Sequence, residues 1–353
     1  MKGRLQQPPP ALVSVVVVNC NRRDLLRDCL RSLAAQQGVS FEVILVDNGS
    51  ADGSPEMALS EFASGVPFHL RLLSNPDNRG FCEANNQGIA VARGEFVALL
   101  NNDAVAEPDW IAALLAAFDG RPDVGMAASK ILVYEDPARI DKAGHLIYLD
   151  GQNRGRGAGE IDHGQYDRVE EVLWPDGCAC MYRKSMLDQI GGFDEDFFAY
   201  ADDAELGLRA RICGWGCFYI PTAVVRHHRG ATLGVRSYKR LELIERNRVL
   251  LAAKLFPWSL LWLNVPYLLA RIAASIWAAA RNQGEVSRYP GFQAKFQMIG
   301  TLLLADLKAI PLLPKMFRKR RQLTTIRKLN SSELTKLLKR FRITLRRLTE
   351  QAI

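Results

Sequence analysis

Residues 94–109 read GEFVALLNNDAVAEPD, an apolar run that stops abruptly at two amides and a carboxylate. The hydrophobic residues 96–100 predict a strand buried on both faces, as in a parallel sheet covered by helices. Asn101, Asn102 and Asp103 follow this strand, and the ligands of open α/β sheets bind at that edge. Taken alone, Asp103 is equally well explained as a turn or helix-capping residue.

Two similar strand ends precede this stretch. Residues 12–18 and 41–46 form apolar, β-branched runs, and leucines at positions 25, 26, 30 and 33 predict an amphipathic helix between them. This β-α-β pattern predicts two parallel strands joined by a right-handed crossover. The loops after the two strands contain the polar residues Asn19, Asn21, Asp47 and Asn48. A second carboxylate is therefore expected at the ligand-binding edge of the same sheet.

The alternation of strands and helices continues along the chain. Residues 68–73 predict a weaker third strand, the turn NPDNRG (75–80) leads into a helix over 81–92, and residues 125–133 predict another strand. Four βα units by residue 115 favour a doubly wound α/β domain. Residues 135–167 are rich in Gly, Asp and Arg with little periodicity, so we expect a mobile loop region there, the kind that forms lids over substrates.

Acidic residues are densest in a segment that is also rich in aromatic side chains. Residues 191–216 read GGFDEDFFAYADDAELGLRARICGWG, after a strand-like stretch at 173–183 and a short helix at 184–190. Asp202 and Asp203 lie at the start of a predicted helix, where the helix dipole alone would favour acids. Crowded carboxylates beside aromatic rings also have raised pKa values, which suits one of them for general-base catalysis.

A last predicted strand, residues 218–225, brings two histidines to its end. They are His227 and His228, two of only five histidines in the chain. Carboxylate and imidazole ligands together suit a divalent cation such as Mn²⁺ or Mg²⁺. The histidine pair therefore indicates a metal site that also uses carboxylates.

The composition is that of a globular protein whose basic charge is concentrated near one end. Of the 353 residues, 48% are hydrophobic and 24% are charged. Residues 315–347 carry thirteen Lys and Arg against Glu333, a charge of +12, so the remaining chain sums to −4 within the total of +8. This segment favours a local anionic partner such as a membrane surface. Nucleic acid is disfavoured, because leucines at 334, 337, 338 and 345 predict an amphipathic helix and no nucleic-acid-binding motif accompanies it.

Cysteine usage and the N-terminus bear on the compartment. Seven cysteines, an odd number without a metal-type CxxC pair, indicate free thiols in a reducing compartment. Residues 1–11 are expected to form a flexible leader, and the VVVV run that follows is too short for a signal peptide or a membrane span. The catalytic body is thus expected to face the cytoplasm.

The region before the basic segment is strongly apolar. Residues 238–254 predict an amphipathic helix, and residues 255–280 are almost continuously apolar, with Trp or Tyr at 258, 262, 267 and 277. Pro257, Pro266 and Arg271 interrupt this run, and a central arginine costs roughly 2.5–3.5 kcal/mol in a membrane span. A pair of interfacial helices is the favoured interpretation, and a re-entrant or spanning hairpin and an ordinary packed helical subdomain remain as alternatives.

Several motifs occur together in the order and with the spacing of one known family. They are SVVVVNCNR (14–22), LVDNGSADGS (45–54), NPDNRGFCEANNQGI (75–89), LLNNDA (99–104), the acidic segment 191–216 and VVRHHRGAT (224–232). Over residues 13–232 the chain resembles a family-2 inverting glycosyltransferase of the rhamnosyltransferase-like kind. The resemblance implies an α/β fold, the GT-A doubly wound mixed sheet of nucleotide-diphospho-sugar transferases, followed here by a C-terminal helical membrane-associating region.

The resemblance places the nucleotide and the metal at the strand ends. Asp47 would accept a hydrogen bond from the base, and Asp103 would hold the Mn²⁺ or Mg²⁺ that bridges the diphosphate, with His227 or His228 completing the coordination. Asn101 stands where the family has the first acid of a D-x-D motif, so we expect weak cation binding until the donor phosphates arrive. The implied donor-binding residues, besides Asp47, are Asn19, Asn21, Asn48, Asn78, Gly80, Asn85, Asn101 and Asn102.

The acceptor side is implied by the acidic segment. Asp203 matches the family's catalytic base, with Asp202 as the alternative, and inversion requires one base and no covalent intermediate. The other acceptor-side residues are expected to be Trp174, Gly177 and Trp215. The implied reaction moves a sugar from dTDP-rhamnose or a UDP-sugar to a hydroxyl of a lipid-linked or cell-surface polysaccharide acceptor.

The expected organisation has four parts: the leader, residues 1–11; the GT-A domain, 12–235; an amphipathic and apolar helical region, 236–314; and a basic tail, 315–353. We expect a peripheral protein, monomeric or homo-oligomeric, at the cytoplasmic face of the cell membrane. A catalytically silent scaffold that binds nucleotide-sugar or glycan is the alternative, but it would not need acids at three strand-end sites. A nucleotidyltransferase would need a Gly-rich phosphate loop after the first strand, which NCNRRD lacks.

Overall fold

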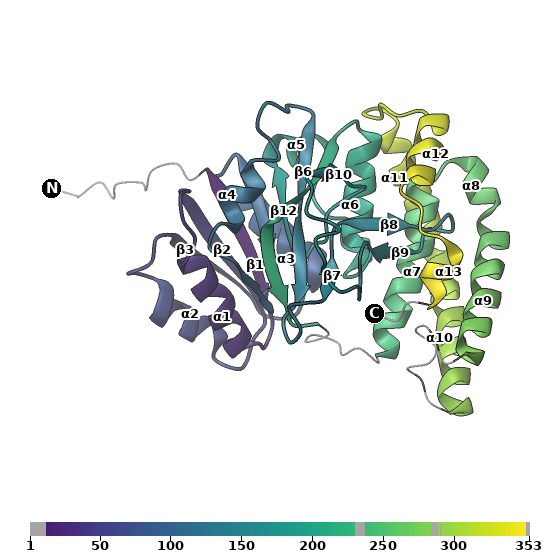
Figure 1. Cartoon of the computed structure of the whole chain (residues 1–353), viewed down its shortest axis with the longest axis horizontal. Helices are drawn as coiled ribbons and strands as arrows, with labels where there is room; N and C mark the ends of the chain where they lie inside the picture. The colour runs from purple at the N-terminus through teal and green to yellow at the C-terminus, as the bar shows by residue number, and fades with distance from the viewer. Residues whose placement is uncertain (1–11, 230–236, 282, 284–288, 290, 351–353) are drawn as a thin grey trace.

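A ten-stranded mixed sheet lies on one side of the molecule and a group of C-terminal helices on the other (Figure 1). This computed structural model describes residues 12–229, 237–281, 283, 289 and 291–350. The predicted leader, residues 1–11, and the end of the predicted catalytic domain, residues 230–235, lie outside the described residues.

The N-terminal half of the sheet is parallel, as the β-α-β pattern predicts. Its order is β4-β1-β2-β3, and the strands are β1 (Val13–Asn19), β2 (Phe41–Asn48), β3 (His69–Asn75) and β4 (Phe96–Leu100). The connecting helices are α1 (Arg23–Ala34), α2 (Ser54–Phe62) and α3 (Gly80–Val91). All five residues of β4 are buried, which confirms the strand expected from its apolar sequence. The polar residues after these strands therefore meet at one edge of the sheet.

The second half makes the sheet mixed. Strand β11 (Ala179–Arg183) runs antiparallel between β4 and β6 (Val124–Val133), and β12 (Gly216–His227) runs parallel to β6. Two short strands, β5 (Ala104–Ala106) and β10 (Glu170–Glu171), pair antiparallel with β12. The helices of this half are α4 (Trp110–Leu115), α5 (Lys184–Ile190) and α6 (Asp202–Ile212), and the single turn η1 spans Glu195–Phe197.

The segment 135–167, expected to be a loop with little regular structure, contains three short strands. Strand β7 (Ile140–Lys142) pairs with β6, and β8 (His145–Ile147) pairs with β9 (Asn153–Gly155). The expectation of an irregular segment was therefore wrong for these residues. The reason is that charged side chains help to hold the segment in place: Lys130 of β6 lies 2.5 Å from Asp162 and 2.6 Å from Asp167, and such pairs leave no hydrophobic periodicity in the sequence.

The C-terminal region is helical and packs against the catalytic domain. Its helices are α7 (Tyr238–Leu255), α8 (Trp258–Trp262), α9 (Asn264–Ala280), α10 (Phe292–Ala309), α11 (Leu313–Leu323), α12 (Ser331–Arg340) and α13 (Leu345–Glu350), with a single turn η3 (Ile310–Leu312) between α10 and α11. Helix α7 contacts α6, α10 and α11. Leu334 and Leu338 of α12 are buried in the main hydrophobic core. The basic segment is thus folded onto the body of the protein over its described residues.

Candidate active site

Polar side chains from three strand ends form one hydrogen-bonded group. The Asn19 amide donates to Asp47 Oδ1 at 3.3 Å and to Ser50 Oγ at 3.1 Å, and the Asn102 amide donates to Asn19 Oδ1 at 2.7 Å. Asp47 Oδ2 accepts from the Ser50 backbone N–H at 2.9 Å. The Asn21 backbone N–H donates to the same Ser50 hydroxyl at 2.9 Å. The structure therefore brings together four predicted donor-side residues around Ser50.

A second group of amides lies at the ends of β2 and β3. The Asn48 side chain donates to Asn78 Oδ1 at 3.0 Å and to the Gly80 carbonyl at 3.2 Å, and its Oδ1 accepts from Asn75 at 3.1 Å. Gly80 begins α3 with a φ of +83°, and a Cβ there would lie 2.5 Å from the Phe198 ring. Gly80 is therefore required both by its backbone conformation and by the close approach of Phe198.

Neither of the other two predicted donor residues makes a side-chain hydrogen bond to these groups among the described residues. The Asn85 side chain donates to the Phe81 carbonyl at 2.9 Å within α3, a bond that ties it to its own helix. The Asn101 backbone N–H donates to the Cys178 carbonyl at 2.8 Å, which links the end of β4 to the start of β11.

Asp103 and His227 lie beside each other at the sheet edge. His227 Nε2 is 3.5 Å from Asp103 Oδ1, and His227 Nδ1 is 2.8 Å from Asp141 Oδ2. Asp103 Oδ1 is buried and has no hydrogen-bond partner among the described residues. Burial raises the pKa of Asp141, but Lys142, His227 and Arg229 outweigh it and hold that pKa below its ordinary value. An ionised carboxylate on one histidine nitrogen, with the other nitrogen facing a second carboxylate, is a common arrangement around bound metals.

The side chain of His228 is directed away from this pair. Its ring stacks on Tyr134 with centroids 3.6 Å apart, and its Nδ1 lies 2.7 Å from Glu135 Oε1. Only its backbone N–H reaches Asp103, donating to the carbonyl oxygen at 2.9 Å. Of the two predicted histidines, the structure therefore brings the His227 side chain to Asp103.

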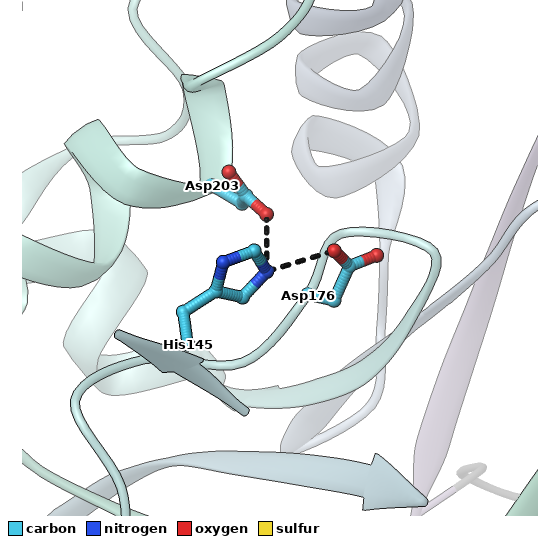
Figure 2. A group of neighbouring side chains, drawn as sticks. All are labelled: His145, Asp176 and Asp203. Carbon is cyan, nitrogen blue, oxygen red and sulfur yellow. Dashed lines mark hydrogen bonds and ion pairs between the residues drawn. The ribbon is translucent and has the colours of Figure 1, made fainter. Parts of the chain in front are cut away.

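A second cluster surrounds Asp203 at the start of α6 (Figure 2). His145 Nε2 lies 2.8 Å from Asp176 Oδ2 and 3.4 Å from Asp203 Oδ2, and the three residues bring possible metal-ligand atoms within 4.8 Å of one another. The same oxygen of Asp176 also lies 2.6 Å from Lys142 Nζ. The three residues could hold a metal ion, but a lysine cation is already paired with one of the carboxylates.

The two neighbouring acids of α6 differ in their electrostatic surroundings. Burial raises the pKa of Asp203; His145 opposes this and Asp176 adds to it, and the pKa stays above its ordinary value. Burial and the adjacent Asp203 raise the pKa of Asp202 well above its ordinary value. The pKa of Asp202 is thus raised more strongly than that of Asp203, whose carboxylate lies 3.4 Å from His145 Nε2.

The loop before β11 connects the two clusters. Asp176 and Gly177 face the first turn of α6, where the Gly177 N–H lies 3.4 Å from Asp203 Oδ2. Cys178 follows directly, and His227 opposes the effect of burial, which raises the pKa of the Cys178 thiol. The paired carboxylate and histidine at the sheet edge and the acids of α6 are therefore neighbouring parts of one site.

The three predicted acceptor-side residues have different positions. Trp174 is fully buried, and its ring stacks on His145 with centroids 5.9 Å apart. Gly177 contacts Asp203, as described above. Trp215 precedes β12, at the opposite end of that strand from His227, and donates to Gln189 Oε1 at 2.8 Å. The structure therefore does not bring Trp215 to the other site residues.

Four charged residues of the site were missed by sequence reasoning. They are Asp141, Lys142, His145 and Asp176, and the first three lie in the segment expected to be an irregular loop. The sequence feature that could have indicated them is the stretch IDKAGHLI (140–147), in which Asp141, Lys142 and His145 are flanked by apolar residues. The burial of these side chains depends on contacts with distant parts of the chain, which no local pattern indicates.

Comparison with known proteins agrees with this geometry. The sequence model of the family described as glycosyl transferase family 2 matches residues 14–191. The chain is 32% identical over 224 residues to the N-acetylglucosaminyl-diphospho-decaprenol L-rhamnosyltransferase of Mycobacterium tuberculosis, covering 58% of this chain and 71% of that protein. It is 29% identical over 234 residues to the uncharacterized protein y4gI of Sinorhizobium fredii, of whose length the chain spans only 25%.

A solved structure shares the fold. The mannosyltransferase PcManGT from Pyrobaculum calidifontis, in complex with GDP-Man and Mn²⁺, superposes with a TM-score of 0.54 at 18% identity, covering 87% of this chain and 91% of that one. The mixed sheet with its C-terminal helices is therefore a GT-A fold, as the motifs predict. The family match extends over half of the sequence and includes most of the strand ends described above, and the chain belongs to glycosyltransferase family 2.

Proposed function

We propose that this glycosyltransferase transfers a sugar, with inversion, from a nucleoside-diphosphate sugar to a hydroxyl group of a lipid-linked or cell-surface polysaccharide acceptor. One observation carries the proposal: Asp203, a carboxylate with a raised pKa, lies in the same site as the Asp103–His227 pair at the sheet edge. dTDP-rhamnose and UDP-sugars are the favoured donors. The mycobacterial relative, named N-acetylglucosaminyl-diphospho-decaprenol L-rhamnosyltransferase, supports a rhamnose donor and a lipid-linked acceptor.

The donor is proposed to bind along the ends of β1, β2 and β4. Asp47 would accept a hydrogen bond from the base, and the amides grouped around Ser50 and Asn48 would contact the remainder of the nucleotide. Asp103 and His227 fit a Mn²⁺ or Mg²⁺ ion, because one oxygen of Asp103 is buried with no hydrogen-bond partner among the described residues and lies 3.5 Å from His227 Nε2, while Asp141 orients the His227 ring. Such an ion supplies positive charge that stabilises the departing diphosphate.

The Asp103–His227 pair is a better metal site than the cluster around Asp203. In that cluster Lys142 already lies 2.6 Å from Asp176, so a divalent cation would have to compete with an ammonium group for the same oxygen. A metal on Asp203 would also lower its pKa and so weaken it as a base. We therefore assign the metal to the sheet edge and the base to α6.

Asp203 is the proposed general base. Its carboxylate would take the proton of the acceptor hydroxyl while that oxygen attacks the anomeric carbon, and the nucleoside diphosphate would leave from the opposite face. One displacement at that carbon inverts its configuration without a covalent enzyme intermediate. Asp202 is the poorer candidate, because burial and the adjacent Asp203 raise its pKa well above the ordinary value and so disfavour its ionised form.

The C-terminal region is proposed to dock on the cytoplasmic face of the cell membrane. Large apolar side chains are exposed along one face of each of two helices: Val265, Leu269, Ile272 and Ile276 on α9, and Phe296, Ile299, Leu303 and Leu307 on α10. Their spacing of three or four residues makes two continuous stripes. Exposed apolar patches of this kind indicate an interaction surface.

The inward face of α9 favours docking over spanning. Arg271 Nε lies 2.6 Å from Asp150 and its Nη2 lies 2.8 Å from Glu245, so the arginine that interrupts the apolar run is paired with acids of the protein. A spanning α9 would have to give up these buried pairs. Among the described residues, one helical stretch, Phe296–Leu323, has the length of a membrane span and contains an 18-residue window with a mean hydropathy of 1.5, but the stretch ends in the basic helix α11.

The decisive experiment is a transfer assay with the purified full chain, a panel of UDP-, dTDP- and GDP-sugars, and Mn²⁺ or Mg²⁺. We expect metal-dependent transfer from one class of donor. Asp203→Asn should lower kcat by about 10²–10⁴-fold with nucleotide binding retained, because proton transfer is lost. Asp202→Asn should have a much smaller effect.

An exposed acid of α5 provides the control. Asp188→Asn removes a carboxylate whose only ion pair among the described residues is with Lys184 of the same helix, and it should leave kcat unchanged. The proposal is wrong if no donor supports transfer. The assignment of the base is wrong if Asp203→Asn retains the wild-type kcat.

A further inference from the structure

The loop before α6 has a rare backbone conformation. Phe198, Tyr200 and Ala201 have φ angles of 63°, 67° and 55°, in the left-handed region that residues other than glycine seldom occupy. Each such residue costs on the order of 1–3 kcal/mol and persists only where its surroundings hold it. The loop leads directly into Asp202 and Asp203, the first residues of α6. The position of the proposed base therefore depends on the contacts that hold this loop.

Helix α7 supplies the first set of these contacts. The Asn247 side-chain amide donates to the carbonyl oxygens of Phe197, Ala199 and Tyr200 at 2.9, 2.9 and 2.7 Å. Arg246 Nη2 also donates to the Phe197 carbonyl, at 3.0 Å. Asn247 is fully buried, so these bonds are shielded from water. Two adjacent residues of the C-terminal region thus bind the backbone of the loop.

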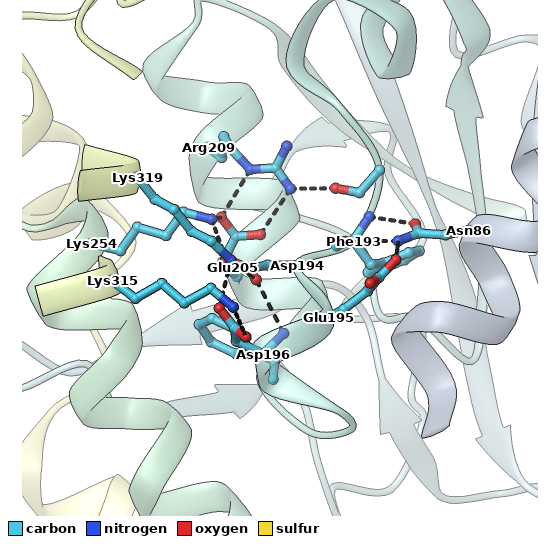
Figure 3. Close-up of polar contacts among 12 residues, drawn as sticks. Asn86, Phe193, Asp194, Glu195, Asp196, Glu205, Arg209, Lys254, Lys315 and Lys319 are labelled. Atoms are coloured by element: carbon cyan, nitrogen blue, oxygen red, sulfur yellow. Dashed lines mark hydrogen bonds and ion pairs between the residues drawn. The ribbon is translucent and has the colours of Figure 1, made fainter. Parts of the chain in front are cut away.

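Helix α11 supplies the second set, through two lysines that bind acids just before the loop (Figure 3). Lys319 Nζ contacts both Asp194 Oδ1 and Asp196 Oδ2, the latter at 2.7 Å, and Lys315 Nζ lies 2.6 Å from Asp196 Oδ1. Lys254 of α7 lies 2.6 Å from the other oxygen of Asp194. Burial raises the pKa of Asp194, but Lys254 and Lys319 outweigh it and lower that pKa to about 2. Asp194 is therefore an anion held by two helices at neutral pH.

The network of ion pairs continues into α6. Glu205 is fully buried and lies 2.6 Å from Lys254, and its two oxygens each accept a hydrogen bond from Arg209 at 2.8 Å. Lys254 thus binds Asp194 on one side of the loop and Glu205 on the other. A continuous set of charged contacts joins α11 to the helix that begins with Asp202 and Asp203.

We propose that Lys315 and Lys319 are positioning residues for sugar transfer, which hold the loop so that the Asp203 carboxylate meets the acceptor hydroxyl. The inference rests on the proposed function, in which Asp203 is the base. The two lysines are four residues apart on α11 and both bind Asp196, whereas Arg318 has no ion pair among the described residues. Part of the basic segment thus serves the catalytic site as well as any anionic surface outside the protein.

The kinetic test replaces the lysines by methionine, which keeps an apolar stem and removes the charge. In Lys315→Met/Lys319→Met we expect kcat for transfer to fall about 10-fold or more, while the Kd of the nucleotide with Mn²⁺ changes less than about twofold. Lys319→Arg should retain kcat, because a guanidinium can bind both carboxylates. The matched control is Arg318→Met, which removes one charge from the same helix at a residue without an ion pair among those the structure describes, and it should keep the wild-type kcat.

Hydrogen exchange provides a second readout that does not need turnover. The amides of Phe197, Phe198 and Glu205 are hydrogen-bonded within the loop and the first turn of α6. In the double methionine variant they should exchange about 10-fold faster than in Arg318→Met, while amides of β1 stay protected in both.

Two results would overturn the proposal: exchange equal to that of Arg318→Met, or a kcat equal to that of Arg318→Met. A wild-type protein that transfers no sugar would instead count against the proposed function. In that case the exchange rates would still decide whether α11 holds the loop.

Discussion

At the scale of single residues, the chemistry of the site depends on which side chains are kept charged. Asp141 and Asp176 have pKa values below the ordinary range, because Lys142 and nearby histidines outweigh the effect of burial. Asp203, in the same region, has a raised pKa. The site therefore separates carboxylates that are permanently ionised from one that can accept a proton, which is the division of roles that acid–base catalysis requires.

The pH dependence of transfer should reveal the raised pKa of Asp203. A general base acts only when deprotonated, so kcat/KM should be constant at higher pH and fall as the pH decreases through the pKa of Asp203. Since that pKa lies above the ordinary value of 3.8, the fall should begin at a higher pH than for an exposed aspartate. A pH profile measured with saturating metal checks this. An acid limb at or below the ordinary value would contradict it.

Asp141 should control metal affinity through His227. Asp141→Asn removes the ionised partner of the His227 ring, and loss of such a partner lowers metal affinity by about 10–100-fold. Titration with Mn²⁺ in the presence of the nucleotide measures the effect. Glu135→Gln is the matched control, because it alters the equivalent partner of His228, whose side chain faces away from Asp103. Equal losses in both variants would mean that the two histidines have been assigned incorrectly.

At the scale of elements, the start of α3 is joined to the loop that leads to the proposed base, Asp203. The backbone N–H groups of Phe81 and Cys82 donate to the Phe198 carbonyl at 2.8 and 3.2 Å, and the Phe198 ring lies against Gly80. Helix α3 and the loop before α6 therefore share one contact. Because α3 and the loop before α6 both depend on this contact, a change there is expected to affect the whole site.

Gly80→Ala should be more destabilising than an equivalent change at a glycine in open space. A positive φ costs an alanine about 1–2 kcal/mol, and a Cβ placed 2.5 Å from the Phe198 ring adds about 1–3 kcal/mol of overpacking. Gly38 has a similar φ of +74° with no atom within 4 Å, so Gly38→Ala measures the backbone cost alone. Urea denaturation of both variants gives the comparison. Equal losses of stability would show that the loop moves away at no cost.

At the scale of the whole molecule, the apolar and the charged surfaces belong to different parts of the C-terminal region. The outward stripes of α9 and α10 are apolar, whereas α11 and the segment after it use several basic residues on acids of the catalytic domain, including Arg340 on Glu171 and Arg347 on Glu160. The charge available to an outside partner is thus smaller than the sequence total suggests. Docking on a membrane would then depend mainly on apolar contacts.

Membrane attachment should be lost when charge is placed on the α10 stripe. Leu303→Glu/Leu307→Glu changes two side chains that are 58% and 61% exposed, and sedimentation with vesicles containing anionic lipid should fall about 10-fold or more, because each buried leucine contributes about 1.5–3 kcal/mol. Transfer to a water-soluble acceptor should be unaffected. Leu59→Glu, at a leucine of α2 that is 47% exposed, is the control and should sediment normally. Undiminished sedimentation of the α10 variant would rule out this stripe as the docking surface.

The principal strands and helices up to residue 133, and the polar residues that follow those strands, could be predicted from the sequence alone. Apolar runs such as 96–100 can only be buried, and Asn19, Asp47 and Asp103 follow them directly, so a polar edge was predictable from local pattern alone. The family motifs added the roles of these residues. Both kinds of information are local, since each depends on residues that are neighbours in the chain.

The set of side chains that meet at that edge depends on tertiary contacts and could not be predicted from the sequence. The tertiary structure placed β11 antiparallel between β4 and β6, selected His227 over His228, and brought His145 and Asp176 to Asp203. It also showed that the basic segment is folded onto the body. These features depend on strand pairing and on buried ion pairs between residues that are far apart in sequence. The energies of such contacts depend on burial and on distance, and neither can be calculated from composition or hydrophobic periodicity.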